Sequence, residues 1–161
     1  MIVQKAAYEL LFFVSSDMPD KKEHENQVLQ IFRNLISDFP KGKVVQTESP
    51  DFLIRLNRRK VIGIELTELH GQIFFDNQGY YNQPELLFQN IERTISAKEE
   101  KIYLYQKVKP VELWLLIHLR SFQNQLSFHY RNKLSNWDFN SSFDRIFLLE
   151  ETSRELHEID T

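Results

Sequence analysis

Two carboxylates, Asp51 and Glu65, lie in two predicted strands that are joined by a short polar turn. Residues 51–56 and 61–67 alternate between apolar and mixed positions, which is typical of strands because successive side chains point to opposite faces. Matching the apolar faces puts Asp51 opposite Glu65, with Cβ atoms roughly 4.5–5.5 Å apart. Carboxylates this close repel each other unless a cation lies between them or one takes a proton. The pair therefore predicts half of a site for a hard divalent ion such as Mg²⁺.

The register of this hairpin follows from its apolar residues, with Phe52 expected opposite Ile64. A slip of one residue would turn every apolar side chain to the wrong face. This pairing needs a loop of odd length, and Asn57–Arg59 is the expected loop. The basic turn from Arg55 to Lys60 lies on the order of 15–20 Å from Asp51 along the strand. It would either grip a nucleic-acid backbone at a distance or be a solvated turn.

The chain resembles the PD-(D/E)XK nuclease superfamily, which has the restriction-endonuclease-like fold, in Pro50-Asp51 and in Glu65-Leu66-Thr67. The spacing of the two acids and the Gly-Ile-Glu run that ends at Glu65 both fit the motif of that superfamily. Thr67 stands where the motif has its lysine, and members of the superfamily are known to replace or relocate this lysine. The resemblance implies hydrolysis of phosphodiester bonds with Mg²⁺ or Mn²⁺ as the cofactor.

The resemblance also implies the metal ligands. Asp51 and Glu65 would hold the ion, and the backbone carbonyl of Leu66 would add a ligand. Members of the superfamily often bring an acid from their first helix, and Glu25 matches that place best; the alternative is a first-turn acid favoured by the helix dipole. Glu48, three residues before Asp51, is either a further acid of the metal shell or a solvated loop residue.

A lysine for catalysis is expected on a later helix, predicted from Pro84 to about Lys107. Lys98 lies on the apolar stripe of this helix, where a lysine either extends its amine to solvent or meets an acid. In the superfamily, a helix after the hairpin can supply the displaced lysine. Lys98 is therefore the candidate for the cation missing at Thr67, where it would polarise the attacking water or stabilise charge on phosphate. Lys101 is the second candidate, and a surface lysine is the alternative.

Four residues are expected to contact the substrate. Thr67 lies on the second predicted strand, and Lys101 lies on the predicted helix. Arg131 and Lys133 belong to a later basic segment.

The remaining elements are predicted from periodicity and capping signals. A helix should run from about Lys21 to Asp38, since Asp20 and Glu23 have the form of a capping box. A short strand should cover Lys43–Thr47, the most apolar strand Glu112–Leu119, and the last strand Arg145–Glu150. Residues 151–161 should be frayed or a short helix. His24 is expected to be exposed, and His118 to be a hydrogen-bonded residue of the core or its rim.

This order of elements predicts an α/β fold with a mixed sheet flanked by helices. It matches the αβββαβ core of the restriction-endonuclease-like fold over most of the chain. No repeat or linker interrupts the 161 residues, so a single domain spanning 1–161 is expected.

Composition limits the remaining choices. The chain has no cysteine, which excludes disulfides and thiolate ligands and is compatible with a cytoplasmic location. No stretch approaches the roughly 18 apolar residues of a membrane span, and Glu9 interrupts the apolar run near the start, so neither a membrane partner nor a signal peptide is expected. A net charge of −3 argues against a generic basic nucleic-acid binder, although a metal-neutralised nuclease need not be basic.

Two functions from different classes remain. The first is a metal-dependent nuclease whose partner is nucleic acid, with DNA expected rather than RNA. A homodimer is compatible with this function. The second is a catalytically inactive module of the same fold that binds nucleic acid or a protein partner. A third interpretation makes the acids structural, with Glu65 or Glu68 paired to Arg55 or Lys60 across the hairpin.

Overall fold

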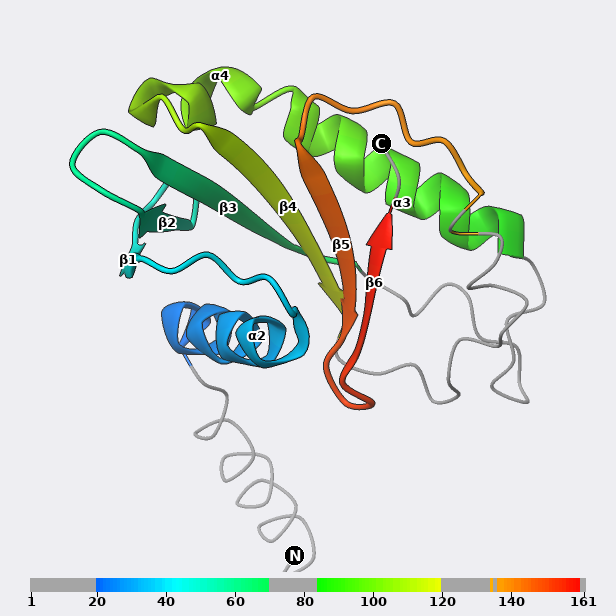
Figure 1. Cartoon of the computed structure of the whole chain (residues 1–161). Coiled ribbons are helices and arrows are strands. Elements are labelled where there is room, and N and C mark those ends of the chain that lie inside the picture. Colours follow the sequence, from blue (N-terminus) through cyan, green and yellow to red (C-terminus); the bar gives the residue numbers. More distant parts are fainter. Residues whose placement is uncertain (1–19, 70–83, 120–133, 135, 160–161) are drawn as a thin grey trace, which may run out of the picture.

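The computed structural model of the chain describes residues 20–69, 84–119, 134 and 136–159. Within these residues, six strands form one mixed sheet whose strand order follows the chain. Helix α2 covers one face of the sheet, and α3 and α4 cover the other (Figure 1). The elements are α2 (Lys21–Leu35), β1 (Lys43–Gln46), β2 (Phe52–Arg55), β3 (Val61–Glu68), α3 (Pro84–Glu99), α4 (Ile102–Tyr105), the 3₁₀ helix η1 (Gln106–Val108), β4 (Glu112–Leu119), β5 (Arg145–Glu150) and β6 (Glu155–Ile159).

The sheet combines both strand directions. Strands β1, β2 and β3 are antiparallel neighbours, β3, β4 and β5 are parallel, and β6 returns antiparallel to β5. Parallel neighbours need a crossover, which α3 and α4 supply between β3 and β4. The predicted α/β class with a mixed, helix-flanked sheet is confirmed.

The predicted hairpin register is also confirmed. Phe52 pairs with Ile64 and Ile54 pairs with Ile62. The Leu56 amide donates a hydrogen bond of 3.0 Å to the Lys60 carbonyl, so residues 57–59 form the odd loop.

Two apolar layers, one on each face of the sheet, form the core. The layer under α2 contains Val28 and Phe32 of that helix together with Trp114 of β4. The layer under α3 contains Leu87 and Ile91, packed on the alternate residues of β4 and β5. From Leu113 to Leu119 β4 is buried along its length, as expected of a central strand covered on both faces.

Helix α2 begins at the predicted residue but ends at Leu35, three residues before the expected end. Ile36 is already extended, and the carboxylate of Asp38 accepts hydrogen bonds of 2.9 and 3.4 Å from the guanidinium of Arg145. Asp20 is the residue before the helix, as predicted, but within the described residues its side chain makes no capping hydrogen bond. The capping box therefore predicted where the helix begins but not the hydrogen bond.

Two further predictions were wrong. The long helix expected over 84–107 is broken after Glu99, whose carboxylate instead accepts hydrogen bonds from the Ser141 hydroxyl and the Ser142 amide. The tail after Glu150 is a strand, β6, rather than a frayed or helical segment. A turn through Arg154, which has a left-handed φ of 55°, reverses the chain so that β6 pairs with β5. No helix in the described part of the chain has the length and apolar character needed to cross a membrane.

Candidate active site

Asp51 and Glu65 meet at the start of β2 and the middle of β3. The Asp51 amide donates to Glu65 Oε2 at 3.3 Å, and the Leu66 amide donates to Asp51 Oδ2 at 2.7 Å. The register that puts Phe52 opposite Ile64 carries Asp51 to the position opposite Glu65. The structure therefore brings together the two acids that the hairpin pattern paired.

The turn before β2 fixes where Asp51 lies. The Thr47 amide donates to the Asp51 carbonyl at 2.7 Å, and the Thr47 hydroxyl donates to the Pro50 carbonyl. Gly63 on the neighbouring strand makes room for this turn. A Cβ atom on Gly63 would lie 2.9 Å from Pro50 Cγ and 2.9 Å from Leu113 Cδ1, closer than packed carbon atoms come. Steric crowding by Pro50 and Leu113 therefore explains why position 63, two residues before Glu65, is a glycine.

Lys98 reaches this pair from α3. Its Nζ lies 2.7 Å from Glu65 Oε1, and the side chains of Lys98 and Glu65 are only 18% and 8% exposed. The hydroxyl of Tyr105 donates to the same carboxylate oxygen at 3.1 Å. Lys98 was expected either to extend its amine to solvent or to meet an acid, and the structure shows that it meets Glu65.

Glu25 approaches from α2, on the other side of the sheet. Its side chain is 13% exposed, and its carboxylate accepts a hydrogen bond of 3.2 Å from Gln46 and lies 3.5 Å from Lys21 Nζ. Its negative charge contributes to raising the pKa of Asp51, which places the two acids within electrostatic reach. Asp51 and Glu65 are thus the hydrogen-bonded pair, and Glu25 acts on Asp51 through its charge from the side of α2.

The electrostatics of the site centre on Asp51. Burial raises its pKa to about 7, and the charges of Glu65 and then Glu25 act in the same direction. The Leu66 amide and the Lys98 ammonium oppose this rise but do not cancel it. Burial and Glu65 also raise the pKa of Tyr105, so its hydroxyl stays protonated and donates. An excess of buried oxygen donors with one carboxyl titrating near neutrality fits a hard divalent cation.

The other predicted residues are less centrally placed. The Glu48 side chain is 88% exposed and pairs with Lys22 at 3.0 Å, so the geometry does not group it with the other acids. Thr67 is partly exposed on β3, two residues after Glu65. Lys101 is exposed just beyond α3, and its amide donates to the Lys98 carbonyl at 3.0 Å. Arg131 and Lys133 lie outside the described residues.

Tyr105 is the member of the site that was not predicted. It lies seven residues after Lys98, a spacing that puts two side chains on one face of a continuous helix. A buried tyrosine hydroxyl needs a partner, and a lysine on the same stripe points to an acid nearby. That combination is the signal that could have found it.

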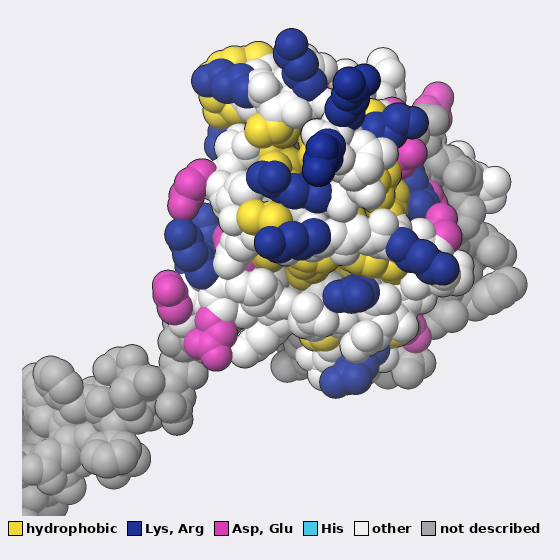
Figure 2. Space-filling view, turned by 60° about the vertical axis from the view of Figure 1, so that its left-hand side comes forward, with side chains coloured by type: hydrophobic (Ala, Val, Ile, Leu, Met, Phe, Trp, Pro, Cys, Tyr) yellow, Lys and Arg dark blue, Asp and Glu magenta, His cyan; other side chains and the backbone are white. Residues whose placement is uncertain are grey.

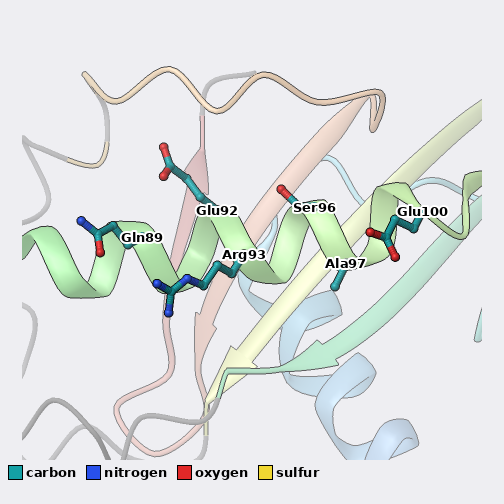
Figure 3. A pocket seen from close by; sticks show the side chains of 6 residues that line it. All are labelled: Gln89, Glu92, Arg93, Ser96, Ala97 and Glu100. Carbon is teal, nitrogen blue, oxygen red and sulfur yellow. The ribbon is translucent and has the colours of Figure 1, made fainter.

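A separate hollow lies along α3, and Figure 3 shows the side chains that line it. Its described lining residues come from α3 and from Glu100 directly after it, and they carry charges of both signs. The Glu92 carboxylate accepts a hydrogen bond of 2.8 Å from the Trp137 indole. These side chains lie along the helix rather than pointing at a common centre (Figure 3), so the hollow is a weaker candidate than the convergent acids. The lining residues are Gln89, Glu92, Arg93, Ser96, Ala97 and Glu100.

Comparison with known proteins adds no relative from which a function could be carried over. The chain matches no protein-family model, no curated protein and no solved structure.

Proposed function

We propose that this protein is a metal-dependent nuclease that hydrolyses phosphodiester bonds in nucleic acid. The observation that carries the proposal is the meeting of Asp51, Glu65 and Lys98, with Lys98 Nζ 2.7 Å from the Glu65 carboxylate. Glu65 and Lys98 come from β3 and α3 and have largely buried side chains, and Asp51 directly precedes β2. Such a cluster is costly to bury without a role, because each acid raises the cost of ionising the next.

The metal ligands would be Asp51, Glu65 and Glu25, with the carbonyl of Leu66 as a further donor. An Mg²⁺ or Mn²⁺ ion bound there would supply an acidified water and neutralise phosphate charge. Asp51 must lose its proton to act as a ligand, which its pKa of about 7 permits near neutral pH. Tyr105 orients the Glu65 carboxylate by its hydrogen bond.

Lys98 would serve in place of the motif lysine that Thr67 replaces. A cation held 2.7 Å from Glu65 lies next to any phosphate that shares the ion bound by that carboxylate. There it can stabilise the charge that develops on the phosphate during attack. The relocation of a lysine from β3 to α3 keeps this charge in the site although the motif position is uncharged.

The order of the elements supports the restriction-endonuclease-like fold. Helix α2, strands β1 to β3, helix α3 and strand β4 follow one another as in the expected αβββαβ core. The antiparallel β1 to β3 meander joined to a parallel β4 is the mixed arrangement that this core requires. The acids then lie on the hairpin of the meander, as the resemblance implies.

A basic face supports nucleic acid as the substrate. Figure 2 shows Lys and Arg side chains spread over the side of the molecule that carries the β2–β3 turn and the segment around α4 and η1. Tyr103, 64% exposed, adds a ring on which a base could stack. Lys43 of β1 pairs with Arg55, so the start of β1 lies beside the β2–β3 turn. The exposed cations of these segments and of the start of β1, which we call the basic face, are Lys41, Lys43, Arg55, Arg58, Arg59, Lys60, Lys101, Lys107 and Lys109.

The proposal is tested by calorimetric titration with Mn²⁺ and Mg²⁺. The wild type should bind with millimolar affinity or tighter, and Asp51→Asn and Glu65→Gln should each abolish most of the heat. Glu48→Gln is the matched control, since it removes an acid of the same chain that is exposed and paired with Lys22. Cleavage of double-stranded DNA, single-stranded DNA and RNA is then followed with the same variants.

The outcomes separate the two functions. Metal binding and cleavage that are both lost in Asp51→Asn support the nuclease. Metal binding without cleavage of any substrate favours the inactive module that binds nucleic acid or protein. Heat that is absent, or unchanged in both variants, would overturn the metal site itself.

A further inference from the structure

A second group of metal-ligating side chains lies apart from the candidate active site. His24 Nε2 is 3.1 Å from Glu151 Oε2, and His118 Nδ1 is 2.7 Å from Glu151 Oε1. The two imidazole rings meet edge to face with centroids 5.5 Å apart. The prediction that His24 is exposed was wrong, since its side chain is only 16% exposed, whereas His118 is buried and hydrogen-bonded as predicted.

The parallel strands place this group. His118 lies at the carboxyl end of β4, and Glu151 follows the carboxyl end of the neighbouring β5, where its amide donates to the Leu119 carbonyl at 3.0 Å. His24 comes down on them from the first turn of α2. Outside the carboxyl ends of parallel strands is where α/β proteins commonly bind ligands.

The two sites occupy different faces of the sheet. Glu65 is paired with Leu115, whose side chain belongs to the apolar layer under α3. Trp114 and Leu116 belong to the layer under α2, and strand alternation puts His118 on that same side. His24, His118 and Glu151 therefore form a group separate from Asp51 and Glu65, since His118 and Glu65 lie on opposite faces of the sheet.

We propose that His24, His118 and Glu151 bind a first-row transition ion, with Zn²⁺ as the expected occupant. Two imidazole nitrogens and one carboxylate are a zinc ligand set, whereas a hard ion such as Mg²⁺ prefers oxygen alone.

The distances suit an ion of this size. The three ligand atoms lie within 4.8 Å of one another, and ligands of tetrahedral zinc with bonds of about 2.1 Å lie about 3.4 Å apart. Small rotations of the imidazole rings are enough to close this difference. The side chains of His24 and Glu151 are 16% and 14% exposed, which leaves a way in for the ion and for a water as fourth ligand.

A bound ion would fasten α2 to the sheet. Each ligand comes from a different segment, so the ion would join the start of α2 to the ends of β4 and β5. Binding to the folded state alone stabilises a protein by mass action, so the site predicts a metal-dependent melting temperature.

The test uses the full chain freed of metal by chelation and titrated with Co²⁺ and Zn²⁺. Visible Co²⁺ absorption should report nitrogen and oxygen ligands in low-coordinate geometry, and one equivalent of Zn²⁺ should displace it. His24→Gln, His118→Gln and Glu151→Gln should each weaken binding by about 100-fold or more. His157→Gln is the matched control, because that partly buried histidine has a carboxylate 3.8 Å away, on Glu155, without a second histidine among the described residues.

Two results would decide against the site. The first is no Co²⁺ spectrum and no rise in melting temperature with Zn²⁺, which would make the group a hydrogen-bonded His–Glu–His bridge. The second is Zn²⁺ binding that survives His24→Gln. His24 has the most exposed side chain of the three, so this change should disturb the fold least. The double variant Asp51→Asn/Glu65→Gln should keep Zn²⁺ binding, so failure of the nuclease proposal and failure of this one are distinguishable.

Discussion

Asp51 has a folded-state pKa of about 7, mainly because it is buried and next because Glu65 is negative. An exposed aspartate titrates near 3.9, so the folded state binds this proton more tightly than the unfolded state does. Protonated Asp51 therefore favours the folded state. Its contribution to the free energy of unfolding is fully present below pH ~4 and is lost as the pH rises through about 7. The residue is ionised at a cost that a metal ion would offset.

Replacing Asp51 by asparagine should remove that cost. The side-chain amide oxygen introduced by Asp51→Asn can still accept the Leu66 amide, which donates at 2.7 Å in the wild type. At pH 8 in a chelator, Asp51→Asn should melt several degrees above the wild type, in line with ~1–3 kcal/mol. Melting curves between pH 4 and 8 check this, and the gap should shrink toward low pH. A gap that is constant or reversed across this range would contradict the raised pKa.

Single residues were predictable to the extent that a strand register fixes them. Asp51 and Glu65 follow from pairing apolar residues across the hairpin, and the structure has that pairing. Tyr105 and His24 did not follow, because their partners lie 40 and 127 residues away in the chain. No local pattern reports which distant carboxylate a buried hydroxyl or imidazole will meet.

At the scale of elements, the proposed nuclease site takes its lysine from a helix rather than from the strand position of the motif. Thr67 occupies the strand position two residues beyond Glu65, while Lys98 enters from the last turn of α3. Side chains two apart on a strand share a face, so a lysine at position 67 would point to the same side as Glu65. The strand position and the helix position can therefore serve one phosphate.

This relocation predicts a rescue. Lys98→Gln should lower the single-turnover cleavage rate by about 100-fold or more, as expected when a charge-stabilising donor is removed. Adding Thr67→Lys to that variant should recover part of the rate, because it restores a cation on the Glu65 face. Lys101→Gln is the control, since that side chain is exposed. Wild-type cleavage by Lys98→Gln would remove Lys98 from the mechanism.

Elements were predictable where one strong signal covers the whole segment. The apolar run of β4 gave both of its ends correctly. The break between α3 and α4 was missed because the helical period continues through it, while the bonds from Ser141 and Ser142 to Glu99 come from distant sequence. Strand β6 was missed because Glu155–Ile159 is short and polar, and pairing with β5 is what makes it a strand.

At the scale of the whole molecule, charge is segregated rather than balanced. The chain has 20 Lys and Arg against 23 Asp and Glu, so a face rich in cations leaves an excess of acids elsewhere. The net charge of −3 therefore coexists with a face that is rich in cations, as the proposed binding of nucleic acid requires. Composition alone could not reveal this, because it depends on the β2–β3 turn and the α4–η1 segment lying on one side (Figure 2).

The basic face should make binding to nucleic acid depend on salt. The double variant Arg58→Ser/Arg59→Ser should bind DNA more weakly at low salt and reduce the slope of log K against log salt by up to about 2. Fluorescence anisotropy with a labelled duplex at several salt concentrations measures both. Arg93→Ser/Arg154→Ser removes the same charge from exposed positions outside the basic face and should leave the slope unchanged. Equal effects of the two double variants would show that only net charge matters.

The first turn of α2 carries consecutive residues of the two proposed sites. The Glu25 carboxylate accepts a hydrogen bond from Gln46 and its charge acts on Asp51, whereas His24 contacts Glu151, since neighbours on a helix are about 100° apart. An ion held by one side chain restrains the backbone that carries the other. If both proposed ions bind, the two binding equilibria are linked through this turn. Because linkage is reciprocal, the factor by which Zn²⁺ changes the affinity for Mn²⁺ would equal the factor by which Mn²⁺ changes the affinity for Zn²⁺.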